Sequence, residues 1–179
     1  MALVNQFGES QREQLSITKI DLAPPTRIRQ GDIYKDIDYL EYAVEYEGKI
    51  EVSRITFPYV IVMTQDCDLE SDHMQRDDIA KTTDNDKTLI SVILAPIYNY
   101  DHVIIGDHLS KLRLTMAKQG SKLKSFITKN QNKRYHYMEF DHGMGPYDKA
   151  VIDFKHYFST NISYLESVMI ENFVCKIDT

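Results

Sequence analysis

The feature that most constrains the fold is an unbroken apolar run, Tyr59-Val-Ile-Val-Met63, followed at once by the polar stretch Thr64-Gln-Asp-Cys-Asp68. Alternating apolar and polar residues would indicate a strand with one wet face, whereas a continuous β-branched run indicates a strand covered on both faces. A second run of this kind spans 88–97 and is expected to end at Pro96. We therefore expect two covered strands in the middle of one closed sheet, with their polar ends at a common surface.

Weaker strand patterns precede the first run. Residues 31–34 open a strand that 39–46 continues or pairs with, and Glu47-Gly48-Lys49 predicts a turn. Residues 50–57 alternate as a second strand, and Pro58 is expected to break its ladder because proline donates no backbone hydrogen bond.

The middle of the chain predicts a long helix. Asp107 or Ser110 can cap a helix that runs to about Lys129, and Gly120-Ser121 is expected to kink or divide it. Before it, the polar residues 71–87 predict a long surface loop. The remaining patterns predict strands at 135–140 and 149–158, and a helix or a strand at 162–177. Together they indicate an α+β fold, a curved, mostly antiparallel sheet with one long helix inserted at about 107–129.

Composition limits the class of protein. The 179 residues suit one domain over 31–179 with an extended arm over 1–30, and 42% apolar residues suffice for a core. No apolar run approaches ~20 residues and no secretion signal is evident, so we expect a cytoplasmic protein without a membrane span. Cys67 and Cys175 lie far apart, which indicates two reduced, buried thiols.

No motif for a cofactor is present. The chain has no GxGxxG, Walker or GxSxG sequence, and its six histidines show no HExxH or HxH spacing. We therefore expect no nucleotide cofactor and no zinc site.

The charge is distributed unevenly. The net charge is −6, but residues 109–134 hold eight basic residues and no acid, so the remainder balances at −14. On a helix, four of these lysines would fall within a ~40° arc. They are Lys111, Lys118, Lys122 and Lys129. Such a row suits an acidic protein partner or RNA, and the charge dipole also permits a homo-oligomer, although an acidic chain is a poor non-specific polyanion binder.

Three short motifs resemble the PemK/MazF-like group. They are Gly31-Asp32-Ile33, the passage of a strand through Pro58 into Val60-Ile61-Val62, and the strand end Ala95-Pro96-Ile97. The resemblance covers about 31–97 and implies a small SH3-like β-barrel of the kind found in ribonuclease toxins of toxin–antitoxin pairs.

The chain departs from that group at two positions. Phe57 stands where the family has an arginine before the proline, with Arg54 three residues earlier. Tyr98 stands where the family tends to have a serine or threonine. RNA cleavage needs a base near the 2′-hydroxyl and a cation on the phosphate, so the fold can be shared without the activity.

Two groups of residues are candidate sites. Asp66 and Asp68 follow the first covered strand and could hold a divalent cation or could cap turn amides. Tyr135 and Tyr137 share one face of a predicted strand and could stack bases, with His136 between them as a proton carrier or a rim residue.

Three hypotheses follow for function. The first is a non-catalytic or accessory binding protein of a bacterial or phage toxin or defence system. It would act through the basic helix and through the acidic loop within 64–87, a stretch with eight acids and three bases. The second is a metal-independent endoribonuclease that uses Arg54, Asp66 and His136. The third is a metal-dependent hydrolase built on Asp66 and Asp68.

Overall fold

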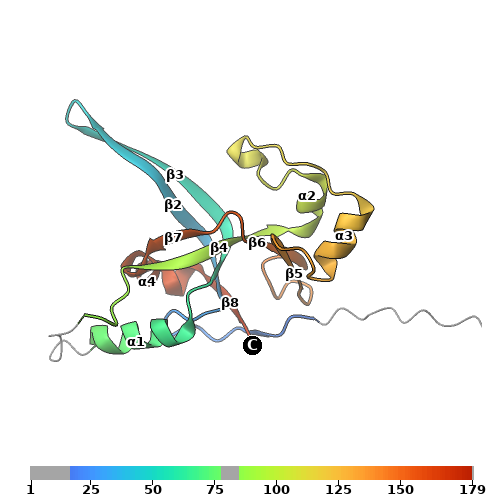
Figure 1. Ribbon diagram of the computed structural model, residues 1–179. Coiled ribbons are helices and arrows are strands. Elements are labelled where there is room, and N and C mark those ends of the chain that lie inside the picture. Colours follow the sequence, from blue (N-terminus) through green and yellow to red (C-terminus); the bar gives the residue numbers. More distant parts are fainter. Residues whose placement is uncertain (1–16, 78–84, 179) are drawn as a thin grey trace, which may run out of the picture.

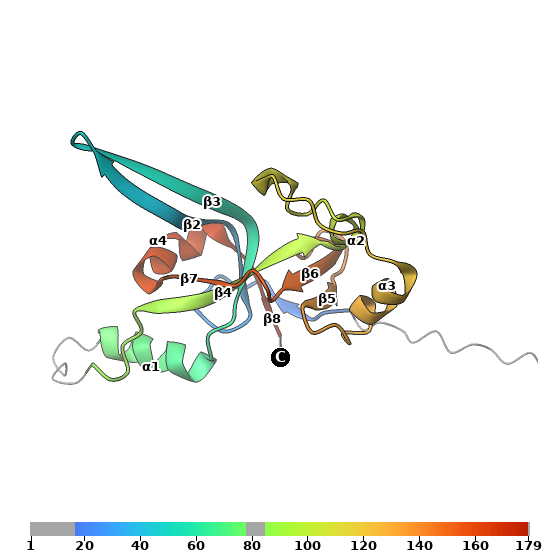
Figure 2. The ribbon, with the colours of Figure 1, turned by 45° about the horizontal axis from the view of Figure 1, so that its top comes forward.

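The computed structural model describes residues 17–77 and 85–178 (Figures 1 and 2). Within them the chain is α+β, with eight strands in one antiparallel sheet of order β1-β8-β2-β3-β4-β6-β5, and β7 pairs with β4 beside this path. The strands are β1 (Ile20–Asp21), β2 (Asp32–Tyr46), β3 (Lys49–Val62), β4 (Ser91–Asn99), β5 (Tyr135–Glu139), β6 (Lys149–Asp153), β7 (Phe158–Asn161) and β8 (Phe173–Ile177). The helices are α1 (Asp66–Asp77), α2 (Tyr100–Ile105), the 3-10 helix η2 (Ser110–Leu112), α3 (Ser121–Thr128) and α4 (Ile162–Asn172).

The two apolar runs lie side by side, as expected. Val60 pairs with Pro96 and Val62 pairs with Leu94 in the β3–β4 ladder, and these side chains are buried. The prediction that Pro96 ends the second run is wrong, because β4 continues to Asn99. Pro96 lies between the stretch of β4 that pairs with β7 and the stretch that pairs with β6, where the strand changes partner.

The concave side of the sheet encloses one core. Its buried members come from β2, β3, β4, β5, β6 and β8, and Ile20 of β1 packs against them. The Thr18 N–H, next to β1, donates to the Glu139 carbonyl of β5 at 2.7 Å, so the two edges of the sheet approach each other. No strand ladder joins β1 to β5 among the described residues, and the sheet is therefore curved but not closed.

Two further cores cover the outer faces of the same sheet. Leu69 of α1 and Leu165 of α4 pack with Val60 and Leu94 on one side. Helices α2 and α3 lie at the opposite end of the molecule and cover the outer face of β5 and β6 (Figures 1 and 2). Cover on both sides explains why β3 and β4 read as continuous apolar runs.

The hairpin of β2 and β3 projects from the body (Figure 1). Its turn residues Glu47 and Gly48 both have positive φ, as a two-residue hairpin turn requires, so the predicted turn is confirmed. The expected break at Pro58 is absent, because β3 continues through it to Val62. Pro58 falls opposite Asp36, whose φ of 51° marks a kink that both strands share.

The predicted loop over 71–87 is partly a helix. Helix α1 extends to residue 77, and residues 78–84 lie outside the described part of the chain. Acidic residues occupy its first turn and Arg76 its last turn, which suits the helix dipole. The polar composition that suggested a loop belongs instead to a helix with one exposed face.

The prediction of one long helix over 107–129 is wrong. Arg113 has a φ of 59° and ends η2, and the chain then runs without regular structure to Gly120, which precedes α3. The Met116 N–H donates to the Gly106 carbonyl at 3.0 Å, so this segment folds back against the end of α2. Gly120 caps the start of α3 and does not divide a helix, because the helical turn before it already ends at Leu112.

Three other segments refine the predictions. The segment 149–158 forms β6 and the start of β7 with a turn between them, and 162–177 forms both α4 and β8. Of the proposed arm, residues 1–16 lie outside the described chain, β1 pairs with β8, and Ile28 is buried in a core. Among the described helices, none has the length and apolar character needed to cross a bilayer.

Candidate functional site

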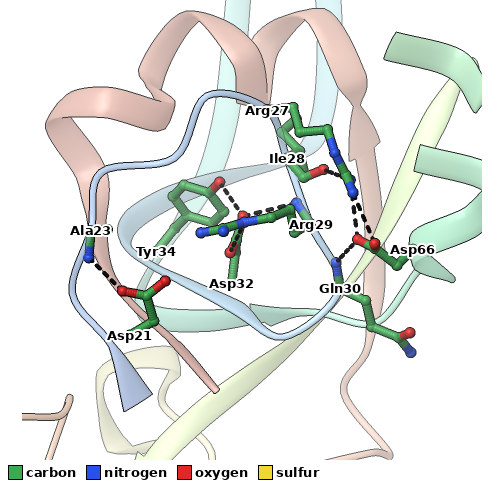
Figure 3. Close-up of polar contacts among 9 residues, drawn as sticks. All are labelled: Asp21, Ala23, Arg27, Ile28, Arg29, Gln30, Asp32, Tyr34 and Asp66. Atoms are coloured by element: carbon green, nitrogen blue, oxygen red, sulfur yellow. Dashed lines mark hydrogen bonds and ion pairs between the residues drawn. The ribbon is translucent and has the colours of Figure 1, made fainter. Parts of the chain in front are cut away.

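Asp66 lies in the first turn of α1, where Arg27 binds it. Arg27 donates to the two carboxylate oxygens at 3.1 and 2.9 Å, and the Gln30 N–H donates at 3.2 Å (Figure 3). The hydrogen bond from Arg27 lowers the pKa of Asp66. Asp68 is exposed one position beyond Cys67. Asp66 therefore anchors α1 to the segment before β2, and it does not stand free beside Asp68.

A buried polar network lies beside this ion pair. The Asp32 carboxylate is inaccessible to solvent and accepts from the Arg29 N–H at 2.8 Å and the Tyr34 hydroxyl at 3.1 Å (Figure 3). Burial raises the pKa of Asp32. Gly31 has a φ of 84°, which the tight turn into β2 requires. The Gly31-Asp32 motif thus has a structural role here: it closes the turn that carries Arg27 toward α1.

The other two proposed catalytic residues lie elsewhere. Arg54 is exposed on the projecting hairpin and pairs with Asp38 at 2.9 Å. His136 is exposed on β5, the edge strand at the other end of the sheet from β1. Its ring lies 6.4 Å from that of Phe154. The structure does not bring Arg54, Asp66 and His136 together: they belong to β3, α1 and β5. The outer part of the β2–β3 hairpin, α1 and β5 lie in different parts of the molecule (Figure 1).

The proposed binding residues are also distributed differently. Tyr135 and Tyr137 share one face of β5, as predicted, but that face is buried under α2 and α3. The lysines do not form one helical row, because they lie on η2 (Lys111), the irregular segment (Lys118), α3 (Lys122) and its C-terminal cap (Lys129). Of the two cysteines only Cys175 is buried, which raises its pKa to about 12, and Cys67 is exposed.

A cleft lies where the β2–β3 hairpin leaves the body, and we call it the arm-root cleft. It comprises two adjoining hollows of about 270 and 220 Å³ that share five lining residues. One wall is β3 and the other is the segment 107–114. The shared residues are Ile55, Phe57, Tyr98, Leu109 and Leu112; Tyr39, Tyr147 and Tyr157 add aromatic surface, and Lys111 lines one hollow.

The second wall owes its shape to Gly106. This residue caps α2 with a φ of 81°, and its N–H donates to the His102 carbonyl at 3.0 Å. A Cβ at this position would collide with the Met116 carbonyl oxygen. Glycine therefore lets the chain from 107 to 116 loop out and return, and this loop brings Leu109 and Leu112 opposite β3.

A charged group lies behind the cleft and involves Asp153, the last residue of β6. Its carboxylate is inaccessible to solvent and accepts from Arg134 Nε at 2.8 Å and Nη2 at 2.6 Å. His156 Nδ1 lies 2.9 Å from the same carboxylate and His156 lines the cleft. This contact is electrostatic and not a hydrogen bond, because His156 Nδ1 has no hydrogen-bond partner among the described residues.

Tyr98 and His108 complete this group, which we call the Asp153 cluster: Tyr98, His108, Arg134, Asp153 and His156. The rings of Tyr98 and His108 are 5.0 Å apart. In the described parts of the chain, the Tyr98 hydroxyl and both ring nitrogens of His108 have no hydrogen-bond partner. Burial lowers the pKa of His108 and of His156, although Asp153 opposes the shift, and burial raises the pKa of Tyr98. Both imidazoles are therefore neutral at pH 7.

The cluster has the components of a metal-free acid–base site. It combines an imidazole beside a carboxylate, a second neutral imidazole, a hydroxyl that keeps its proton and a fixed cation. The ring nitrogens of His108 and the Tyr98 hydroxyl are inaccessible to solvent, so of these polar groups only the His156 imidazole lines the cleft beside the carboxylate. Sequence patterns missed it because Tyr98, His108 and Arg134 come from separate segments. Of the cluster's members, only Asp153 and His156, three residues apart, lie close enough in the sequence to have indicated the site.

Metal binding and relatedness give no further assignment. Among residues 17–77 and 85–178, no group of three or more His, Cys, Asp or Glu side chains is placed to hold a metal ion. No family model, no curated protein and no solved structure matches this chain.

Proposed function

We propose that this protein binds single-stranded RNA in the arm-root cleft. The observation that carries the proposal is an aromatic cleft whose wall is the start of the basic segment 109–134. Tyr157 at the cleft is 65% exposed and offers a ring face to a base. Proteins that bind single strands combine cationic surface along the backbone with aromatic side chains that stack the bases.

The aromatic surface of the arm-root cleft, more than its charge, favours RNA over an acidic protein as the partner. Seven cations of the basic segment are exposed and would attract either polyanion. They are Lys111, Arg113, Lys118, Lys122, Lys124, Lys129 and Lys133. Aromatic rings such as that of Tyr157 can stack the unpaired bases of a single strand. The acidic remainder of the chain would restrict RNA to this end of the molecule.

The resemblance to PemK/MazF-like proteins supports the same assignment. We infer that the curved sheet is a relative of the SH3-like barrel, opened between β1 and β5 and enlarged by the hairpin and by 100–134. Its core of seven strands and the contact between Thr18 and Glu139 support this inference. The proposed setting is a bacterial or phage toxin or defence system, in which this chain has a binding or accessory role.

The Asp153 cluster favours a second candidate, a metal-independent endoribonuclease. In that reaction the neutral imidazole of His156 would take the proton of a 2′-hydroxyl. The oxygen of that hydroxyl would attack phosphorus while the bond from phosphorus to the 5′-oxygen breaks. The products would be a 2′,3′-cyclic phosphate and, once protonated, a 5′-hydroxyl end. Arg134 would act through Asp153, because its Nε and Nη2 donate to that carboxylate and it does not line the cleft. This candidate replaces Arg54, Asp66 and His136 with residues that the fold brings together.

Two measurements on one set of proteins test these functions. Binding of a fluorescent single-stranded RNA is measured for wild type, for Lys111, Lys118 and Lys122 changed to Glu, and for a control with Lys19, Lys35 and Lys49 changed to Glu. We expect only the first triple variant to lose binding. Equal binding by both triple variants would contradict the cleft assignment.

Cleavage is then measured with mixed RNA, with and without EDTA. No cleavage by a protein that binds RNA supports the binding role alone. Cleavage that resists EDTA and is lost in His156→Ala supports the second candidate, whereas EDTA-sensitive cleavage would favour the metal-dependent hydrolase. Binding of an acidic polypeptide but not of RNA would overturn the main proposal.

A further inference from the structure

The outer part of the β2–β3 hairpin, residues 40–54, exposes far more apolar surface than the rest of the sheet; we call it the hairpin arm. Its exposed fractions are Leu40 56%, Tyr42 52%, Val44 47%, Tyr46 71%, Ile50 75% and Val52 52%. Isolated two-stranded hairpins are at best marginally stable in water, and monomers rarely expose large contiguous apolar patches. The hairpin arm therefore has the character of a binding surface.

The strand register divides the hairpin arm into two faces. Opposed residues in an antiparallel ladder point to the same side, and the register shift between Leu40 and Tyr42 absorbs one extra residue, Glu41. One face carries the pairs Leu40–Arg54, Ala43–Val52 and Glu45–Ile50. The other face carries Tyr42–Ser53, Val44–Glu51 and Tyr46–Lys49.

The first face is complementary to itself. Its centre is apolar, with Val52 and Ala43, while Arg54 lies at the root and Glu45 near the tip. When two such faces stack in antiparallel directions about a two-fold axis, the tip of each lies over the root of the other. Glu45 of one copy then approaches Arg54 of the other, twice, and the apolar side chains meet between them.

We propose that the protein forms a homodimer in which two hairpin arms stack through the face of Leu40, Ala43, Ile50 and Val52. The charges of the hairpin arm argue against RNA as the occupant, because four glutamates face only Lys49 and Arg54. Arg54 is 68% exposed in its pair with Asp38 and can accept a second carboxylate. This surface is distinct from the arm-root cleft, so the dimer does not depend on the proposed RNA binding.

Sedimentation of the full-length chain over a range of concentrations tests the proposal. We expect a concentration-dependent dimer in wild type and a monomer in Val52→Glu. Val44→Glu is the matched control, because the same change lies on the opposite face of the hairpin arm and should leave the dimer intact. A wild type that stays monomeric at all concentrations would overturn the proposal, as would dissociation by Val44→Glu alone.

A charge exchange tests the antiparallel arrangement. Glu45→Arg and Arg54→Glu should each weaken the dimer about tenfold or more, since each places like charges together. The double variant should recover most of the affinity of wild type. The ion pair with Asp38 is lost in both Arg54→Glu and the double variant, so it cancels in that comparison. Additive loss in the double variant would rule out the Glu45–Arg54 contact.

Discussion

Asp153 and Arg134 form a two-pronged ion pair in which the Asp153 side chain is wholly buried and the Arg134 side chain is 24% exposed. They are neighbours because Tyr135 pairs with Asp153 in the β5–β6 ladder, one residue after Arg134. The pair fixes the end of β6, and His156 Nδ1 at the cleft lies 2.9 Å from the same carboxylate. Structure and candidate chemistry therefore depend on the same carboxylate.

Replacing Asp153 with Asn tests the structural half of that role. It leaves Arg134 without a counter-charge in a largely apolar place, so we expect the free energy of unfolding to fall by about 3 kcal/mol. Urea denaturation measures the change. Asp148→Asn is the control: Asp148 is exposed beside His142, and we expect a much smaller change. Equal effects would show that the buried ion pair does not stabilise the fold.

The histidines should titrate in a definite order. Burial lowers the pKa of His108 and His156 below 6.5, whereas the hydrogen bond to Asp148 raises that of His142 above it. The unfolded chain takes up protons at His108 and His156 first, so these two groups reduce stability as the pH falls below about 6.5. His142 has the opposite sign, and its contribution is lost as the pH rises. NMR titration of the ring protons checks the order; protonation of His156 before His142 would contradict the described environment.

Gly106 should be essential to the cleft wall. Gly106→Ala combines a left-handed backbone with a collision against Met116, so we expect a loss of stability of about 2 kcal/mol or more and weaker RNA binding. Gly120→Ala is the comparison, because Gly120 has a φ of −72° and open space around it. As a helix cap it should cost less than about 1 kcal/mol. Thermal unfolding and RNA titration of both variants check this.

The parts of the fold that could be predicted are those where burial or turn geometry leaves a pattern in the local sequence. Val60 and Leu94 are covered on both faces, and the turn at Glu47-Gly48 has a strong local signature. Helix α1 was missed because Leu69 and Asp72 are the only buried side chains among residues 66–76, and Asp72 is held by Arg76 and the Leu89 N–H. A buried carboxylate in a helix has no apolar period to reveal it.

The site was harder to predict than the fold because its members meet only in three dimensions. His108 lies in a loop that Gly106 shapes, and Arg134 reaches Asp153 through the pairing of β5 with β6. The helical period that placed four lysines on one face failed because Arg113 ends η2 and the chain then packs back on α2. Tertiary contacts therefore outweighed the helical spacing of residues 107–129.

Binding of single-stranded RNA in the arm-root cleft is best tested by comparing the RNA affinity of variants at two exposed tyrosines. Tyr157 lies at the cleft and Tyr46 near the tip of the hairpin arm, with exposed fractions of 65% and 71%. RNA affinity by fluorescence anisotropy should fall about 5- to 100-fold in Tyr157→Ser, as for the loss of one stacked base, and stay unchanged in Tyr46→Ser. Wild-type affinity in Tyr157→Ser, or no RNA binding by the wild type, would contradict the account.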